Sequence, residues 1–456
     1  MFENTARAHQ SGLAPGEPSA SVPQGEHDDY ALTRVPAAAR YPWWSVAVQR
    51  FGQLSALSQF LLGAALGFGM NFWDAVLAIA LGAVLLEIVA IFTGIIGQRE
   101  GLSTTTLARW TGFGRHGSSL IALVIALSFV GWFGVQSGVS AAGLYKFLPF
   151  LPEWAWALAF GLAVTAVVVG GFGSMAWVAY ATVPAFLLLA GWSIFTELAT
   201  HDLASLTSSP APGPVLSLGA GATLVAGGFI VGMVATPDMS RFNRTSADVI
   251  KQTIIGVTIG EFMVCLAGVL LAHALRTDDI ITIVTSSSGV VGTLVIVAGT
   301  LKINDWNLYS GTLGIVNFFQ SVFGVRVQRV PATWVVGSLG SLLAAGGILA
   351  RLTDFLTLLG ILMPPVAAIM AMEYYVVRTW RRELSASAPG LPASEPTWIP
   401  GAIAVWVLAA LAGQFIPWGI ASVNSLIVVL VIYPIFARLG LLKPTAVAPT
   451  TLSIPD

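Results

Sequence analysis

Residues 74–97 read DAVLAIALGAVLLEIVAIFTGIIG, and Asp74 and Glu87 are the only charged side chains in this stretch. An α-helix rises 1.5 Å per residue, so about 20 apolar residues cross the hydrocarbon core of a bilayer, which is about 30 Å thick. The apolar run is continuous and does not alternate with polar residues, which excludes the strands of a membrane β-barrel. The stretch therefore predicts a transmembrane helix.

Eleven further apolar stretches of this kind occur along the chain, each bounded by charged or turn residues. An all-α membrane protein of about twelve transmembrane helices is therefore predicted. The boundaries at residues 170–173 and at Pro417 have almost no polar spacer. The predicted spans are 51–70, 74–97, 118–142, 153–171, 174–196, 215–237, 250–275, 288–315, 331–350, 353–377, 398–416 and 418–437.

The overall composition agrees with this class. Charged residues make up 9% of the 456 positions, against roughly 25% in a soluble domain, and 56% are hydrophobic. The single cysteine, Cys265, excludes a disulfide framework and a cysteine-based zinc or iron–sulfur site. A net charge of −1 gives no electrostatic basis for binding nucleic acid, and no zinc-protease, serine-hydrolase or phosphate-loop motif indicates an enzyme.

Basic residues predict the orientation. Residues 1–46 contain no apolar run and predict a disordered tail without a secretory signal, and residues 441–456 form a second tail. If the first tail is cytoplasmic, 17 of the 21 Lys and Arg residues fall on the cytoplasmic side. Only Lys146, Arg276 and Arg351 fall on the other side, so both termini are expected in the cytoplasm of a multi-pass protein of the cell membrane.

Glycine is concentrated in the first and sixth spans, with three glycines in residues 63–69 and five in residues 219–232. Broken helices at matching positions in two halves are typical of inverted-repeat transporters, which hold the substrate between the breaks. The alternative is close helix packing, as Gly63-x-x-x-Gly67 would allow. The pattern favours a transporter domain over residues 47–440 with broken helices 1 and 6.

Polar side chains within the spans are candidates for function, since such groups are costly in hydrocarbon. For Glu87 and Glu261 alone, a structural partner in the bundle is the favoured interpretation. The eighth span is different, because four polar residues fall within six positions. We assign Asn304 and Asn307 of this cluster to substrate binding, and Lys302 and Asp305 to ion coupling.

A planar ligand fits another group of residues. Trp132 and Gln136 are four residues apart and share one helical face. The ring could stack on a flat ligand while the amide reads its polar edge, and Phe229 of the sixth span could cover the second face. Each aromatic residue taken singly is more often a packing residue.

These motifs carry a resemblance to a known family. Over about residues 40–440 the sequence resembles the nucleobase:cation symporter-1 family, and within it the cytosine permeases. The resemblance implies ten helices in a five-plus-five inverted repeat, two further helices, and uptake of a nucleobase or related heterocycle driven by a cation gradient, without a cofactor. It rests on Gly101-Leu102-Ser103-Thr104 with Ala108-Arg109, Gly131-Trp132-Phe133-Gly134, Pro237-Asp238 with Arg241-Phe242-x-Arg244, Asn304-Asp305 with Leu308-Tyr309, and Pro364-Pro365 before Glu373-Tyr374.

The resemblance also implies roles in the substrate site. Trp132 corresponds to the stacking tryptophan and Phe229 to the aromatic residue of the sixth helix. Gln136 falls where other members place a ligand-binding glutamine, although cytosine permeases lack it. Gly228 stands where cytosine permeases have a serine, and Gly299 where they have an asparagine. Another nucleobase or a hydantoin-like ring is therefore an alternative to cytosine.

The implied ion site departs from the sodium-coupled members. Those members bind sodium with backbone carbonyls of the first helix, here near Gly52 and Ala56, and with two hydroxyls that align with Lys302 and Ile303. A lysine cannot coordinate sodium and would repel it. We therefore expect coupling to a proton rather than to sodium, with Lys302 either carrying the proton or forming a permanent ion pair with Asp305. A nucleobase sensor or an uncoupled facilitator with the same pocket is the alternative function.

Overall fold

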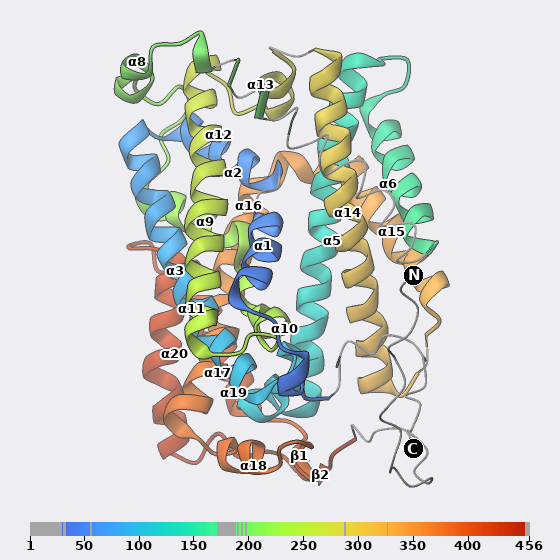
Figure 1. The fold of residues 1–456 in the computed structure, drawn as a ribbon, viewed down its shortest axis with the longest axis vertical. Helices are drawn as coiled ribbons and strands as arrows, with labels where there is room; N and C mark the ends of the chain where they lie inside the picture. Colours follow the sequence, from blue (N-terminus) through green and yellow to red (C-terminus); the bar gives the residue numbers. More distant parts are fainter. Residues whose placement is uncertain are drawn as a thin grey trace, which may run out of the picture.

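The computed structural model of the chain describes residues 30, 33–54, 57–170, 188, 191–192, 195–196, 198–286, 289–325 and 327–451. These residues form a helical bundle whose long helices run side by side (Figure 1). Eleven of the twelve predicted spans coincide with helices, and the predicted span 174–196 lies largely outside the described residues. The all-α fold class is confirmed.

The long helices are interrupted in several spans. The first span contains α1 and α2, the seventh contains α11, the π-helix η3 and α12, and the tenth contains α16 and α17. The helices of the predicted spans are α1 (Trp43–Leu54), α2 (Leu57–Gly69), α3 (Phe72–Glu100), α5 (Gly114–Phe147), α6 (Glu153–Val169), α9 (Leu218–Val234), α11 (Ser246–Ile254), η3 (Ile255–Glu261), α12 (Phe262–Leu275), α14 (Val290–Phe323), α15 (Arg329–Ala345), α16 (Leu352–Leu362), α17 (Pro364–Met372), α19 (Pro400–Phe415) and α20 (Ala421–Arg438).

Short elements connect these helices. Two antiparallel strands near the C-terminus form a small ribbon, with Glu395 opposite Ala448. The short elements are η1 (Ala37–Ala39), α4 (Thr104–Ala108), the π-helix η2 (Arg109–Phe113), α8 (Leu203–Ser208), α10 (Thr236–Ser240), α13 (Ile280–Ser286), η4 (Ile348–Arg351), the π-helix η5 (Glu373–Val377), α18 (Arg381–Ala386), β1 (Ser394–Pro396) and β2 (Val447–Pro449).

Five described stretches are long and apolar enough to cross a membrane by length and composition. They are Phe72–Glu100, Thr104–Phe147, Ser246–Leu275, Ile348–Val377 and Ala421–Arg438. The first of these shows how local sequence sets the ends of a span. The Asn71 side chain accepts a hydrogen bond from the Asp74 amide at 2.9 Å and caps the start of α3. Gly101 ends the helix in the left-handed conformation, with φ 65°.

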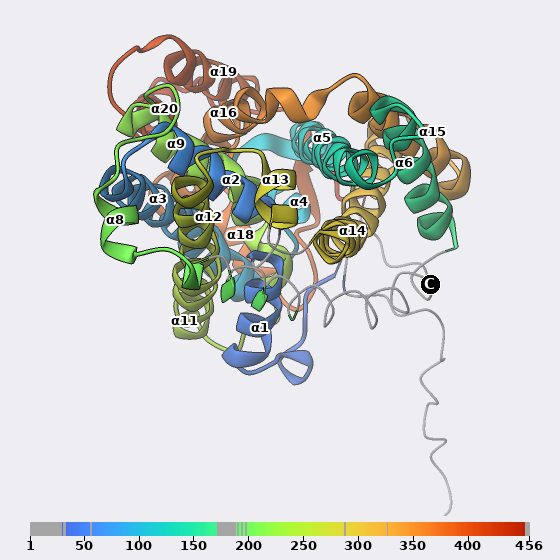
Figure 2. The same cartoon turned by 90° about the horizontal axis from the view of Figure 1, so that it is seen from above.

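Two groups of helices make up most of the bundle (Figure 2). In one group α3 packs on α9 and α2 packs on α12. In the other group α14 and α15 pack on α5, and α15 also packs on α6. The last two helices, α19 and α20, pack on each other and on α16 and α17. The two groups leave a space between α9 on one side and α5 with α14 on the other, where the candidate site lies.

The helix breaks do not lie at the glycines that suggested them. The sixth span breaks at Ala235, between α9 and α10, whereas residues 55–56, between α1 and α2, lie outside the described residues. The glycines instead bring helices into contact. A Cβ atom on Gly63 would lie 2.1 Å from the Cys265 carbonyl oxygen, and one on Gly227 would lie 1.8 Å from the Leu356 carbonyl oxygen. The packing interpretation is therefore correct for Gly63 and Gly227.

Gly227→Ala tests this packing. We expect destabilisation by about 1–3 kcal/mol, because the new methyl group would overlap the backbone of α16 and force the helices apart. Alanine favours an isolated helix over glycine by roughly 1 kcal/mol, so the clash has to outweigh that gain. The measurement is the melting temperature in detergent, with Gly191→Ala as the control because no atom of the described residues lies within 4 Å of its Cβ position. An unchanged or raised melting temperature in Gly227→Ala would contradict this packing.

The predicted tail boundary at residue 46 is too far along the chain. Residues 33–46 lie in defined contacts, and α1 already begins at Trp43. Arg34 Nη1 lies 2.8 Å from Glu100 Oε2 at the end of α3, and the Val35 amide donates to the Gly101 carbonyl at 2.9 Å. These contacts were not predictable from hydropathy, because the segment is too short to span a membrane and is held by hydrogen bonds to residues far along the chain.

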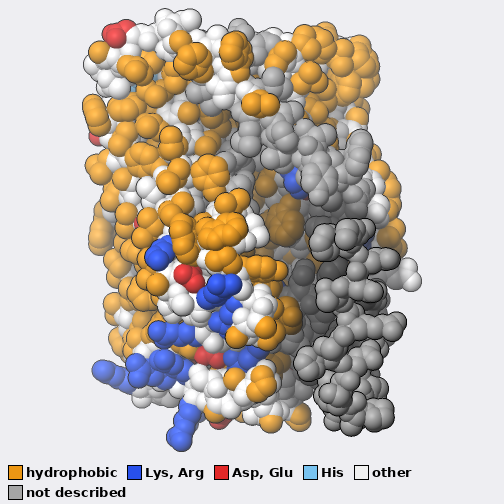
Figure 3. Space-filling model, in the orientation of Figure 1, with side chains coloured by type: hydrophobic (Ala, Val, Ile, Leu, Met, Phe, Trp, Pro, Cys, Tyr) orange, Lys and Arg blue, Asp and Glu red, His pale blue; other side chains and the backbone are white. Residues whose placement is uncertain are grey.

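We call the end of the bundle that carries α10, α18 and the β1–β2 ribbon the basic end. Lys and Arg side chains gather there on the face shown in Figure 3, whereas α8 and α13 lie at the opposite end (Figure 1). A buried ion pair fixes the ribbon to the bundle, because Arg109 Nη1 lies 2.8 Å from Glu395 Oε2 and the Glu395 side chain is fully buried. Thr451, which follows β2, also donates to Glu395, at 3.0 Å.

Candidate functional site

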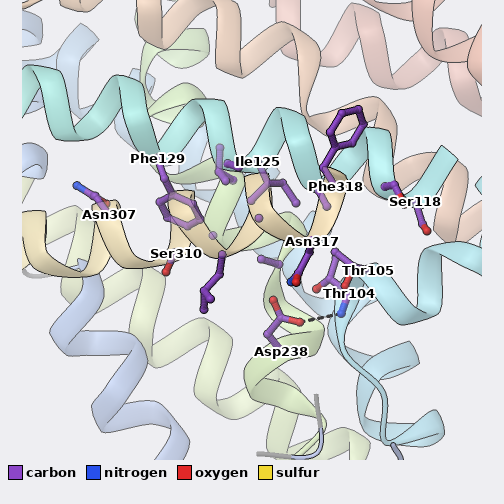
Figure 4. Close-up of a pocket in the computed structure, with 18 of the residues that line it drawn as sticks. Thr104, Thr105, Ser118, Ile125, Phe129, Asp238, Asn307, Ser310, Asn317 and Phe318 are labelled. Atoms are coloured by element: carbon purple, nitrogen blue, oxygen red, sulfur yellow. Dashed lines mark hydrogen bonds between the residues drawn. The ribbon is translucent and has the colours of Figure 1, made fainter. Parts of the chain in front are cut away.

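A cavity of about 780 Å³ lies between the two groups of helices. Its walls come from α2, α4, α5, α9, α10 and α14. Figure 4 shows Phe129 and Ile125 of α5 and Asn307, Ser310 and Asn317 of α14 along it. The cavity runs from the middle of the bundle to the basic end, where Arg115, Gln320 and Thr451 line it.

One face of α5 forms the longest wall of the cavity. Arg115 and Gln136 mark its ends, and 21 residues of helix separate them by about 32 Å. The lining residues recur every three or four positions, as expected for a single helix face. They are Arg115, Ser118, Ser119, Ala122, Ile125, Ala126, Phe129, Trp132 and Gln136.

The opposite wall includes a stripe of small and polar residues on α14, of which only Asn307 was predicted from the sequence. Its spacing of three and four residues is a helical signal that could have been found, because polar residues are rare on a lipid-facing side. The members are Asn307, Ser310, Gly314, Asn317 and Ser321.

The two predicted stacking residues line this cavity from different helices. Trp132 extends from α5, and its ring meets Phe355 edge-on, with the ring centroids 5.5 Å apart and an angle of 78° between the planes. Phe229 extends from α9, and a Cβ atom on Gly232 would lie 2.4 Å from its ring. Gly232 therefore leaves the space that the Phe229 ring occupies. Both rings are partly buried, so each keeps some surface for a ligand.

Gln136 is the most informative residue of the site. Its side chain is fully buried on the cavity wall, and neither Oε1 nor Nε2 has a hydrogen-bond partner among the described residues. An unbonded buried polar group costs about 1–3 kcal/mol. The amide therefore offers one acceptor and one donor, side by side, to a ligand in the cavity.

The two asparagines assigned to the substrate differ. Asn304 does not line the cavity, and its Nδ2 donates to the Phe133 carbonyl at 3.1 Å and to Ser137 Oγ at 3.0 Å. It therefore ties α14 to α5, which corrects its assignment to the substrate. Asn307 lines the cavity, and its Nδ2 donates to Asn304 Oδ1 at 3.3 Å. Gly228 also lines the cavity, as predicted.

Of the four predicted ion-coupling residues, the structure places Lys302 and Asp305 in contact with each other. Lys302 Nζ lies 3.1 Å from Asp305 Oδ1 and 3.2 Å from Oδ2, in the same helix. These are its only hydrogen bonds within the described part of the chain. Gly52 lies within α1, and Ala56 lies outside the described residues. The geometry corresponds to the ion pair that the sequence left as the second possibility.

The sequence of this chain is similar to the sequences of known permeases. Residues 35–429 match the family described as permeases for cytosine/purines, uracil, thiamine and allantoin. The cytosine permease of Escherichia coli K12 is 27% identical over 405 residues, covering 88% of this chain and 92% of the relative. The hydantoin permease of Microbacterium maritypicum is 24% identical over 370 residues, covering 75% and 73%.

Solved structures share the fold. The inward-facing conformation of Mhp1 has a TM-score of 0.76 at 20% identity, covering 90% of this chain and 93% of Mhp1. A closed conformation of Mhp1, a nucleobase-cation-symport-1 transporter with bromovinylhydantoin bound, has a TM-score of 0.70. These relatives are transport proteins and not enzymes, and the match of the family pattern over most of the chain is decisive. The chain is a multi-pass membrane permease of the cytosine/purine permease family, the nucleobase:cation symporter family.

Proposed function

We propose that this permease imports a small planar heterocycle with an amide-like edge, a nucleobase or a hydantoin, together with a proton. The unbonded amide of Gln136 carries the proposal, because it requires a ligand that presents a donor beside an acceptor. Nucleobases and hydantoins have such edges on a flat ring. Trp132 and Phe229 line the same cavity and supply aromatic faces for that ring.

We define the substrate by the donor and acceptor atoms on the edge of its ring, and not as one named compound. Cytosine permease and hydantoin permease are both relatives, and their substrates share a flat ring with donor and acceptor atoms. Gly228 contributes no side-chain hydroxyl to the cavity, and a Cβ atom there would lie 2.8 Å from Leu62 Cδ2. A serine at this position would need a shift of the Leu62 side chain, and in its absence Gln136 and Asn307 supply polar side chains to the cavity.

A proton is the coupling cation that we infer. By the family resemblance, Lys302 stands at a position where sodium-coupled members have a hydroxyl group that binds sodium. Its ammonium group forms an ion pair with Asp305. A fixed positive charge there opposes binding of sodium. The ammonium group of Lys302 also places at this position the positive charge that a bound sodium ion would bring.

Gln136→Ala tests the ligand site. Purified protein is screened by thermal shift against cytosine, uracil, purines, allantoin and hydantoin, since a ligand that binds only the folded state raises the melting temperature. We expect a shift with at least one of them, and a changed ranking among them in Gln136→Ala, because an unpaired polar edge is penalised. Gln320→Ala, at the basic end of the same cavity, is the matched control and should keep the wild-type ranking. The same ranking in Gln136→Ala and the wild type would contradict the proposal.

We propose further that the basic end faces the cytoplasm of a cell membrane, following the distribution of Lys and Arg. Cysteines introduced at Ala386 in α18 and at Ala204 in α8 should react with an impermeant thiol reagent from opposite sides. Both positions are exposed, and the native Cys265 is buried. Labelling of both positions from one side would contradict this topology.

A further inference from the structure

A buried acid lies at the end of the π-helix η3, away from the cavity wall. The Glu261 side chain is fully buried, and neither of its carboxylate oxygens has a hydrogen-bond partner among the described residues. An ionised carboxylate without donors or a counter-ion is strongly disfavoured in an apolar interior. In this arrangement Glu261 is therefore a neutral acid that holds a proton.

The elements packed on η3 bring no free cation to Glu261. From α3 comes Glu87, whose Oε1 accepts a hydrogen bond from Thr258 of η3 at 2.7 Å. A second acid disfavours a negative charge on Glu261. From α12 comes the buried Cys265, and from α11 come Asp248, which caps the start of that helix, and the exposed Lys251.

The remaining neighbour of η3 is α1, which carries the buried Arg50. Its side chain packs against Gly256 of η3, but its guanidinium group bonds elsewhere. Arg50 Nη1 donates to the Gly232 carbonyl at 3.2 Å, and Nη2 donates to Thr236 Oγ1 at 2.9 Å. The charge of Arg50 is therefore directed to the break between α9 and α10, and no counter-ion for Glu261 lies among the described residues.

Buried polar groups connect Glu261 to the ligand cavity. Cys265 follows it by one helical turn, on the same face. Cys265 Sγ lies 3.3 Å from the Gln59 carbonyl oxygen and 3.7 Å from Gln59 Oε1. The buried Gln59 Nε2 has no partner among the described residues, and a Cβ atom on Gly228 would lie 3.5 Å from Gln59 Oε1. Since Gly228 lines the cavity, Gln59 and Cys265 lie between the ligand and Glu261.

Unlike Glu261, Lys302 has a partner of opposite charge. Its ammonium group is bonded to both oxygens of Asp305, so its charge is already compensated, and it does not line the cavity. A group that binds and releases a proton needs one state in which the proton is held and another in which it leaves. An acid without a partner, beside a polar path to the ligand, meets this need better than a fixed ion pair.

We propose that Glu261 is the proton-binding group of this permease. Its carboxylate takes up one proton, and the neutral acid stays buried until the helices rearrange and return the proton to water. Gln59 and Cys265 link this event to the ligand in the cavity, so that ligand affinity depends on pH. The inference rests on the proposed function, because it names the group that carries the coupling cation.

The first test needs no ligand. Infrared spectra of the purified protein show the carbonyl band of protonated carboxylic acids, and Glu261→Gln should remove a component of that band. Glutamine has the shape of the neutral acid, so the variant is expected to fold. Glu87→Gln is the matched control and should keep the component. A band that is the same in Glu261→Gln and the wild type would overturn the proposal.

The second test measures coupling in proteoliposomes with radiolabelled cytosine, uracil and hydantoin. A pH difference of one unit supports up to about ten-fold accumulation for each proton carried. We expect Glu261→Gln to lose this accumulation and to keep exchange of internal for external ligand, whereas Glu87→Gln keeps accumulation. Accumulation that survives in Glu261→Gln, or that is lost equally in Glu87→Gln, would overturn the proposal. Failure of the wild type to bind any of these ligands would count against the proposed function, and the infrared result does not depend on it.

Discussion

Trp132→Ala should weaken ligand binding by about ten-fold or more. Stacking of a nucleobase on an aromatic side chain contributes roughly 1–3 kcal/mol, and each 1.4 kcal/mol is a factor of ten in Kd. The loss should exceed the effect of the removed surface alone, because the Trp132 ring is fixed in place by its edge-on contact with Phe355. The measurement is a binding isotherm with the ligand that gives the largest thermal shift.

Phe318→Ala is the matched control for this prediction. Phe318 also lines the cavity, but it lies near the end of α14, at the basic end, and packs against Phe319 and Phe323. We expect its removal to leave Kd nearly unchanged. Equal affinities in Trp132→Ala and the wild type, with both proteins folded, would place the ligand elsewhere in the cavity.

Lys302→Ala is expected to destabilise the protein, because it leaves the buried carboxylate of Asp305 without its counter-ion. The Asp305 side chain is fully buried, and a third of the Lys302 side chain is exposed. Breaking a fully buried pair costs about 3–5 kcal/mol, and solvent screening of an exposed partner reduces this. We therefore expect a loss of about 1–3 kcal/mol, measured as a fall in the melting temperature.

The double variant Lys302→Met/Asp305→Asn separates the ion pair from the packing of the two side chains. It removes both charges and keeps side chains of similar size, so it should recover most of the stability lost in Lys302→Ala. A double variant as unstable as the single one would show that the ion pair does not account for the loss.

Hydropathy predicted most of the bundle, because a bilayer demands long apolar helices. The stretch 74–97 lies within α3, and the separation at Pro417 falls between α19 and α20 as expected. The positions at which the helices break were harder to predict than the helices themselves. The glycines of the first and sixth spans mark close helix contacts, and the sixth span breaks at Ala235, two residues before Pro237, which disfavours continuation of the preceding helix.

The lining of the candidate cavity was predictable for the residues that carry the family resemblance. Trp132, Gln136, Gly228 and Phe229 all line it, although an aromatic residue taken singly is more often a packing residue. Asn304 was misassigned, since an asparagine that ties two helices together and one that binds a ligand look alike in sequence. Contacts far apart in the chain, such as Arg34 with Glu100, have no periodic signal at all.

The most direct test of the central claim is uptake of radiolabelled nucleobases and hydantoin into proteoliposomes with sodium replaced by choline, with and without an imposed pH gradient. We predict accumulation of at least one ligand that persists without sodium and rises when the outside is more acidic. Binding without accumulation would indicate a sensor, and uptake indifferent to both gradients a facilitator. Strict dependence on sodium would contradict the account, because it would require a sodium site where Lys302 stands.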